Sequence, residues 1–240
     1  SLCSAVGHAA TGVSLNAGAV SFTHIVKAME PFFNTLMGVL LVGAVVPPTV
    51  VATLVPIVGG VVLASVKELS FSWGGLMGGL ASCIALSLRA IVAKAAFEGQ
   101  DGALQPKENL SPANLYGHVN RAAFVVTALA AVVVEGPMLR GGAGLATEQL
   151  HTCLVNVLLS GAVFNLYQEV SFMSLRRLHP VTHAVVNTVK RVVLVMVGVV
   201  VLQEQLSPRA SVGAAVSLTG VLLYSLATYR VKMKATAKSA

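Results

Sequence analysis

Long apolar stretches, separated by short segments rich in glycine, proline and charge, run through almost the whole of this 240-residue chain. A helix that crosses a membrane needs roughly 20 apolar residues, since it rises about 1.5 Å per residue. Breaks at glycine, proline and charged residues divide the chain into eight candidate spans. The pattern therefore predicts an all-α polytopic membrane protein with spans at about 1–14, 19–43, 48–66, 71–97, 113–135, 148–175, 179–202 and 208–229.

Composition agrees with this class. The chain is 55% hydrophobic and 10% charged, its mean hydropathy is +0.81, and 22 glycines are spread through the apolar runs. A soluble domain of this length does not need so many apolar residues to form its core. Glycines allow helices to pack closely in lipid. The net charge of +7 lies largely in loops and the C-terminal tail, which favours contact with lipid headgroups over nucleic-acid binding.

Loop cations predict the orientation of the chain. With eight spans, both ends lie on one side of the membrane. Eight loop cations fall on that side and three on the other, so the positive-inside rule places the ends in the cytoplasm or its topological equivalent. The eight are Lys94, Lys107, Arg176, Arg177, Arg230, Lys232, Lys234 and Lys238, and the three are Lys67, Arg140 and Arg209.

A repeated motif organises the chain. The sequence THIVKAMEP begins at Thr23, and THAVVNTVKR begins at Thr182, 159 positions later. The same offset relates His8 to Tyr167 in the preceding helices. The first copy lies in the second candidate span and the second copy in the seventh, which is an odd number of spans later. The helices that carry the two copies therefore cross the membrane in opposite directions. Inverted repeats of this kind are typical of secondary transporters, which bind substrate at the repeat interface. Chance similarity between two apolar helices is the alternative.

Lys190 and Arg191 are neighbouring cations within an apolar helix, where an ionisable group is costly and usually functional. Two adjacent positive charges repel each other in a low dielectric unless an anion lies beside them. The planar guanidinium and the compact ammonium together suit phosphate or carboxylate, so a dianionic ligand is predicted. Alternatively, both side chains extend to the membrane interface, or they pair with a buried carboxylate.

Lys27 and Glu30 lie three residues apart, on one face of a helix. Lys27 is predicted to contact the ligand, with Glu30 as its partner when the site is empty; a purely structural ion pair is the alternative. Pro31 follows directly and lacks a backbone donor, so it should loosen the helix one turn further on. Such interruptions often surround transporter sites or hinges.

Three further polar side chains are candidate contacts for the ligand: His8, Thr11 and Tyr167 each bring a hydrogen-bond donor into an apolar helix. Arg89 is a secondary candidate. Catalysis is poorly supported, because the chain has one aspartate, no close carboxylate pair for a metal, no P-loop and no activated nucleophile. The three cysteines are isolated within apolar sequence and are expected to be packing thiols. No cofactor or metal is predicted.

The segments AVSFTHIVKAMEPFF, from Ala19, and VTHAVVNTVKRVV, from Val181, resemble the plastid phosphate translocator family of the drug/metabolite transporter superfamily. The motifs EVSFMSL, VVVEGP and GVLLYS extend this resemblance along nearly all of the chain. Two residues depart from the family pattern: Val186 stands where the family usually has glycine, and Glu169 replaces an uncharged residue.

The resemblance implies ten helices in two inverted halves and exchange of inorganic phosphate for a phosphorylated metabolite across the inner plastid envelope. It implies that this chain is a fragment lacking the first two helices, with residues 1–66 completing the first half and 71–234 forming the second half of one transporter domain. It also implies that Lys27, Lys190 and Arg191 grip the phosphate, that His8, Thr11 and Tyr167 complete the pocket, and that Arg89 lies nearby.

The substrate remains open at this point. His8 and KAMEPFFN favour a triose-phosphate type, whereas QEVSFMSL leans towards phosphoenolpyruvate or hexose-phosphate types. A nucleotide-sugar carrier, a membrane enzyme acting on phosphate esters, and a structural or receptor protein with paired charges are the rival classes. The expected partners are phosphate, small phosphorylated metabolites and membrane lipid. The sequence does not predict an oligomeric state.

Overall fold

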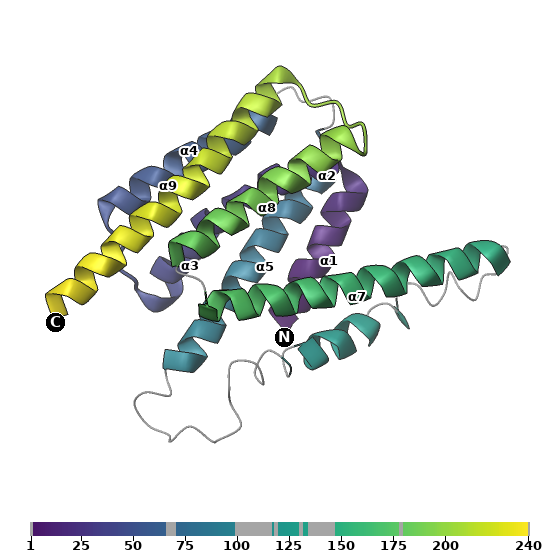
Figure 1. The fold of residues 1–240 in the computed structure, drawn as a ribbon, viewed down its shortest axis with the longest axis horizontal. Coiled ribbons are helices and arrows are strands. Elements are labelled where there is room, and N and C mark those ends of the chain that lie inside the picture. The colour runs from purple at the N-terminus through teal and green to yellow at the C-terminus, as the bar shows by residue number, and fades with distance from the viewer. Residues whose placement is uncertain are drawn as a thin grey trace.

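The computed structural model describes residues 2–65, 71–98, 117, 120–129, 132–133, 147–177 and 180–239. These residues form helices and their connections, and they include no strand. The elements are α1 (Leu2–Ala17), α2 (Val20–Val26), the 3₁₀ helix η1 (Lys27–Met29), α3 (Glu30–Val42), α4 (Pro48–Ser65), α5 (Trp73–Glu98), α7 (Thr147–Arg177), α8 (Pro180–Val200) and α9 (Pro208–Ser239) (Figure 1).

The predicted all-helical membrane fold is confirmed. Helix boundaries follow the predicted spans closely, except that α9 continues to Ser239 and α2, η1 and α3 together form one span. Within the described residues, four stretches are long and apolar enough to cross a membrane. They are Val20–Val42, Pro48–Ser65, Trp73–Val92 and Pro208–Val231. Of the span predicted at 113–135, only residues 117, 120–129 and 132–133 are described.

Glycines bring α4 and α9 into backbone contact. A Cβ added to Gly60 would lie 2.5 Å from the backbone nitrogen of Ser217, and one added to Gly213 would lie 2.5 Å from the carbonyl oxygen of Gly60. No real side chain fits at such distances. The two helices lie side by side along much of their length (Figure 1). Small residues at helix interfaces are the usual means of close packing in lipid, where no hydrophobic force joins two helices.

A second tight interface joins α1 to α5. A Cβ on Gly78 would lie 2.9 Å from the backbone nitrogen of Ser14. The Ser14 hydroxyl is fully buried and lies 2.6 Å from the carbonyl oxygen of Gly75 and 3.0 Å from the Thr23 hydroxyl. These bonds connect α1, α2 and α5 and satisfy polar groups that would otherwise be costly inside the membrane.

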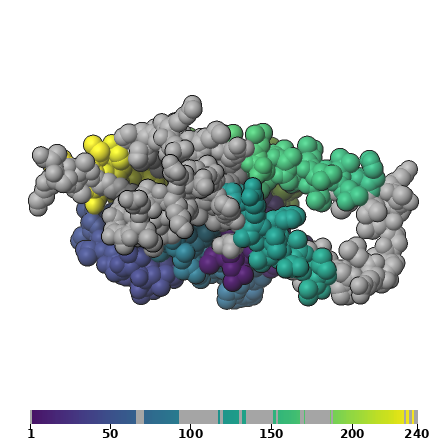
Figure 2. Space-filling model, turned by 90° about the horizontal axis from the view of Figure 1, so that it is seen from below, coloured from purple at the N-terminus to yellow at the C-terminus, as the bar shows by residue number. Residues whose placement is uncertain are grey.

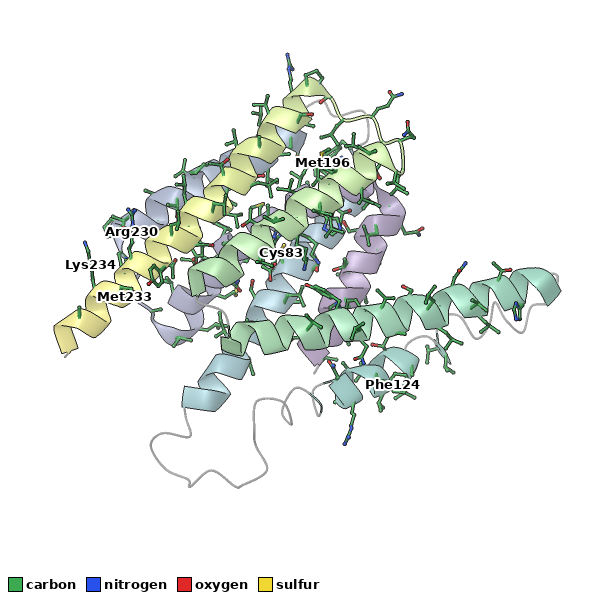
Figure 3. The ribbon with its side chains drawn as sticks, viewed as in Figure 1. Cys83, Phe124, Met196, Arg230, Met233 and Lys234 are labelled. Atoms are coloured by element: carbon green, nitrogen blue, oxygen red, sulfur yellow. The ribbon has the colours of Figure 1, made fainter. Side chains whose placement is uncertain are left out.

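Helix α2 lies at the centre of the packed core. Its side chains Phe22, Ile25 and Val26 are at most 1% exposed, and they pack against Ala64 of α4 and Val195 of α8. In α5, Cys83 points into the middle of the bundle (Figure 3), where its thiol is 1% exposed. Residues that follow directly after α2 therefore emerge in the interior of the protein.

Proline 31 explains the interruption after α2. The residues from Lys27 to Met29 leave α-helical geometry and form the single 3₁₀ turn η1. Because Pro31 has no N–H, an α-helical bond to the carbonyl of Lys27 is impossible, and the N–H of Glu30 takes that carbonyl in a 3₁₀ bond instead. The sequence predicted the loosening one turn further on, and this position was wrong: the 3₁₀ turn precedes Pro31, because the α-helical bond that is lost is the one to the carbonyl of Lys27.

The ends of the chain and α7 complete the arrangement. The N-terminal and C-terminal ends lie towards the same end of the bundle, opposite the connection between α8 and α9 (Figure 1). Arg230 and Lys234 lie near the C-terminal end of α9 (Figure 3). Helix α7 reaches out beyond the packed helices (Figure 2), and Leu158 and Leu166 on it are 72% and 63% exposed. Such apolar exposure suits a lipid environment.

Candidate functional site

Arg191 reaches from α8 to the interrupted turn after α2. Its Nη1 donates a hydrogen bond to the carbonyl oxygen of Lys27, the oxygen that Pro31 leaves without an α-helical donor. The break in the helix therefore leaves this carbonyl with the 3₁₀ bond from the N–H of Glu30, and a cation from the second copy of the repeated motif donates to it as well. The sequence did not predict that Arg191 would use this carbonyl.

Arg191 also forms an ion pair with Glu30. Its Nη2 lies 2.6 Å from Glu30 Oε2, and the two side chains are 8% and 33% exposed. Glu30 thus pairs with Arg191 from the other repeat, whereas the sequence suggested Lys27, three residues away, as its partner. A guanidinium buried to this degree needs a counter-charge, because an unpaired charge in a low dielectric is costly.

Lys27 contacts hydroxyl groups of α1 and α5. Its Nζ lies 2.9 Å from Thr11 Oγ1 and 3.3 Å from Ser82 Oγ, and these two hydroxyls are 2.7 Å apart. Both partners are neutral, so they hold the ammonium in place without cancelling its charge. The positive charge of Lys27 remains available to an anion.

Lys190 contacts Tyr167 of α7 in two ways. Its Nζ donates a hydrogen bond to the phenol oxygen and lies 4.8 Å from the centre of the ring. A cation beside an aromatic face gains electrostatic stabilisation, but its charge is not neutralised. Lys190 directly precedes Arg191 in α8, which keeps the two cations close together. The side chain of Lys190 is only partly buried, so it stays accessible.

His8 and Arg89 lie at the edge of this group. The His8 ring packs edge-on against Phe164 of α7 at a centroid distance of 5.6 Å, and Phe164 in turn lies 6.3 Å from the Tyr167 ring. Arg89 Nη1 lies 3.3 Å from Ser4 Oγ on α1, one turn before His8. The structure therefore links His8 to the cations through aromatic contacts and places Arg89 beside α1.

The cations make a site of positive charge. Lys27, Lys190 and Arg191 contribute three positive charges and Glu30 contributes one negative charge, which leaves a formal charge of +2. Direct bonds join Arg191 to Lys27 and to Glu30, while Lys190 is its sequence neighbour. In the part of the chain that the structure describes, no group of three or more His, Cys, Asp and Glu residues is placed to hold a metal. The arrangement is suited to binding an anion with two negative charges.

Two contributors were not found from the sequence. Ser82 joins Lys27 to Thr11, and Phe164 joins His8 to Tyr167. A serine or a phenylalanine within an apolar helix carries no signal of its own, because only tertiary contacts give it a partner. Of the two departures from the family pattern, Val186 is 53% exposed on α8, and the side chain of Glu169 lies outside the described residues.

A family model for the Triose-phosphate Transporter family matches residues 1–225. The chain belongs to this family. Among curated proteins, it is 39% identical over 224 residues to a chloroplastic phosphoenolpyruvate/phosphate translocator 1 of Oryza sativa subsp. japonica. That match covers 92% of this chain and 53% of the relative.

Triose-phosphate carriers match as well. The chain is 36% identical to a triose phosphate/phosphate translocator of non-green plastids from Brassica oleracea var. botrytis, covering 92% of this chain and 54% of the relative. It is 33% identical to a chloroplastic triose phosphate/phosphate translocator of the same plant, covering 96% and 55%. The chain spans about half the length of the curated relatives it matches.

Proposed function

We propose that this protein is an antiporter that exchanges inorganic phosphate for phosphorylated three-carbon metabolites, such as triose phosphate and 3-phosphoglycerate. The observation that carries the proposal is the formal charge of +2 left when Glu30 is set against Lys27, Lys190 and Arg191. Inorganic phosphate near neutral pH and the phosphate group of a sugar phosphate carry up to two negative charges, so either anion balances the cluster.

The ion pair between Glu30 and Arg191 suggests how occupancy is coupled to movement. In the proposed cycle, an incoming phosphate takes over the guanidinium, since Arg191 has the fork geometry that a phosphate accepts. Without a bound anion, the remaining positive charge opposes closure of the site around it. The carrier therefore changes its access only when loaded, which makes transport an obligatory exchange by alternating access.

The remaining polar groups are assigned to support and recognition. Thr11 holds Lys27 and Tyr167 holds Lys190, so both ammonium groups are fixed before the substrate arrives. Pre-organisation of this kind reduces the entropy cost of binding. His8 and Arg89 are proposed to face the organic part of the substrate, since they lie beyond the phosphate-binding cations.

The names of the relatives support phosphate as one of the exchanged substrates, but they differ in the organic substrate. Phosphoenolpyruvate/phosphate and triose phosphate/phosphate translocators both match. Phosphoenolpyruvate and hexose or pentose phosphates are therefore the alternative substrates. The relatives are chloroplastic proteins, and the chain has membrane-crossing helices, so we place it in a plastid membrane and propose the inner envelope. We further propose one transporter domain, with 1–66 in its first half and 71–234 as its second, and transport without chemical conversion.

The proposal is tested by phosphate counter-exchange in liposomes that contain the full-length protein. Lys190→Ala and Arg191→Ala should each abolish exchange while the protein remains folded by circular dichroism. Arg209→Ala is the matched control, because Arg209 is an exposed cation at the start of α9, and this variant should exchange at the wild-type rate. Wild-type exchange in both cluster variants would refute the phosphate clamp.

A substrate panel then separates the alternatives. Triose phosphate, 3-phosphoglycerate, phosphoenolpyruvate, glucose 6-phosphate and a nucleotide-sugar are each tested as counter-substrates for labelled phosphate. Exchange with the three-carbon compounds supports the proposal. Exchange with the nucleotide-sugar alone indicates a nucleotide-sugar carrier, and product formation without exchange indicates an enzyme.

A further inference from the structure

The helices that carry the site end in the same way. At the end of α3, the N–H of Ala44 bonds to the carbonyl of Gly38 at 3.1 Å, with Gly43 at a φ of +65°. At the end of α8, the N–H of Glu204 bonds to the carbonyl of Gly198 at 3.1 Å, with Gln203 at a φ of +55°. In both turns, the residue after a left-handed residue bonds to a carbonyl six positions earlier.

The two turns are related by the inverted repeat. The pairs Gly38 and Gly198, Gly43 and Gln203, and Ala44 and Glu204 are each 160 positions apart. Pro48 and Pro208, the first residues of α4 and α9, have the same spacing. Since the repeats are inverted, the two turns lie at opposite membrane faces. Ala44 and Glu204 therefore occupy equivalent places on the two faces.

Only one of these equivalent residues bonds across the repeat interface. Glu204 Oε1 accepts a hydrogen bond from the backbone N–H of Val20 at 2.7 Å, and Oε2 accepts one from Ser21 at 2.9 Å. These N–H groups begin α2, so they have no acceptor within the helix, and the carboxylate also complements the helix dipole. We refer to Glu204, Val20 and Ser21 as the latch.

In the described part of the chain, the residue equivalent to Glu204 cannot form such a latch on the opposite face. Ala44 has no acceptor in its side chain, so it cannot accept the bonds that Glu204 accepts. That face also contains a cavity of about 530 Å³, which Ala44 and Val45 line together with residues of α4, α5 and α9. Val45 there is 96% exposed, whereas Ser21 in the latch is fully buried.

Close packing shows that the latch is built into the fold. A Cβ added to Gly198 would lie 2.7 Å from Glu204 Oε2 and 3.1 Å from the backbone nitrogen of Ser21. Any larger residue at this position would separate α8 from α2. Gln203 takes a left-handed conformation, which is unfavourable for a residue other than glycine, and the turn it forms directs the chain so that Glu204 reaches α2.

We propose that Glu204 is a positioning residue that holds the carrier closed at the face of the α8–α9 turn, so that this face opens only when the latch breaks. The proposal rests on the alternating access of the proposed function. It deepens that function by assigning closure of one face to a charged latch and leaving the other face to apolar contacts. Removing the latch shifts the equilibrium from the state that is closed at this face towards the state that is open at this face, and it leaves the anion-binding cations in place.

Two cysteine reporters test the latch in the full-length protein, with Cys3, Cys83 and Cys153 replaced by alanine. Ser21→Cys replaces the buried side chain of a latch residue whose backbone N–H makes the bond, and Ala44→Cys lies in the open cavity of the opposite face. The rate of maleimide modification is measured in detergent for each reporter. Glu204→Gln should raise the rate at position 21 by about tenfold or more, because a charged acceptor of two bonds is lost, and should lower it at position 44. Gln205→Ala, at the next and exposed position, is the matched control and should change neither rate.

The outcomes are distinct. Opposite changes at the two reporters support the latch. A rise at both would show that Glu204 only stabilises the fold, and no change at either would remove it from gating; both results overturn the proposal. Glu204→Asp, which keeps the charge, should restore part of the wild-type pattern. No phosphate is needed for this measurement, so a failure of the proposed substrate leaves the result interpretable.

Discussion

Arg191 and Glu30 are 161 positions apart in the chain, yet Nη2 of one lies 2.6 Å from Oε2 of the other. Their contact crosses the interface between α8 and the helix that begins at Glu30. The same arginine bonds to the carbonyl of Lys27, which Pro31 leaves without its α-helical donor. An ion pair and a helix break are thus combined at one point, beside the other two cations of the site.

If Glu30 holds Arg191 while the site is empty, it competes with phosphate for the guanidinium. Glu30→Gln should then tighten phosphate binding by about tenfold, because no charged pair has to be broken first. Exchange should become slower, since the tightly held anion leaves slowly. Calorimetric titration and counter-exchange measure the two effects. Weaker binding in Glu30→Gln would show that Glu30 supports the site instead of competing with its ligand.

Tyr167 should affect affinity through its hydroxyl. Tyr167→Phe keeps the ring beside Lys190 and removes the hydrogen bond, so phosphate binding should weaken about three- to tenfold while exchange persists. Tyr224→Phe is the control, because the Tyr224 hydroxyl bonds to Thr35, 2.9 Å away on α3, and not to a cation of the site. Equal weakening in both variants would argue against a specific role for Tyr167.

Proline 31 should contribute to binding through the backbone. Pro31→Ala restores an N–H that can form the α-helical bond to the carbonyl of Lys27, so the 3₁₀ turn would straighten and its carbonyl would point along the helix, away from Arg191. Thermal stability should rise, and the further stabilisation that phosphate gives should become smaller. Pro56→Ala provides the comparison, since Pro56 lies inside α4, outside the site. If phosphate stabilises Pro31→Ala as much as wild type, the break in the helix has no role in recognition.

The contact between α4 and α9 should depend on one glycine of an adjacent pair. A Cβ on Gly60 would meet backbone atoms of α9, whereas a Cβ on Gly59 would meet no atom within 4 Å. Gly60→Ala should lower the free energy of unfolding by about 1–3 kcal/mol through overpacking. Gly59→Ala should be neutral or slightly stabilising, because alanine favours helix. Thermal unfolding in detergent distinguishes the two, and equal effects would contradict the packing of these helices.

The latch should weaken in acid. Partial burial raises the pKa of Glu204, but hydrogen bonds from Ser21 and Val20, together with the charge of His24, outweigh it, so the pKa lies below its ordinary value. A lowered pKa gives stability that is complete above the ordinary carboxyl pKa of about 4.3 and disappears as the pH falls through the lowered value. The ratio of the labelling rates at Ser21→Cys in Glu204→Gln and Glu204 proteins should therefore stay constant from pH 7 to about pH 5 and approach one as the pH falls below about 4.3 and through the lowered pKa. A ratio that stays unchanged throughout this acid range would contradict this prediction.

The sequence by itself determined the membrane fold, the approximate helix boundaries, the presence of a helix interruption caused by Pro31, though not its side, and the family. Each depends on local properties: apolar length, a missing N–H, or a long motif. It also singled out Lys27, Lys190 and Arg191, because a cation in an apolar helix is costly wherever the helix lies.

Only the tertiary structure decided how these groups are paired. Glu30 could reach Lys27 along its own helix, but packing of α8 against the broken turn gives it Arg191 instead. Ser82 and Glu204 gain their roles from residues 55 and 183 positions away, respectively. Such partners depend on how closely the helices approach one another, which the glycine interfaces set and which no local pattern encodes.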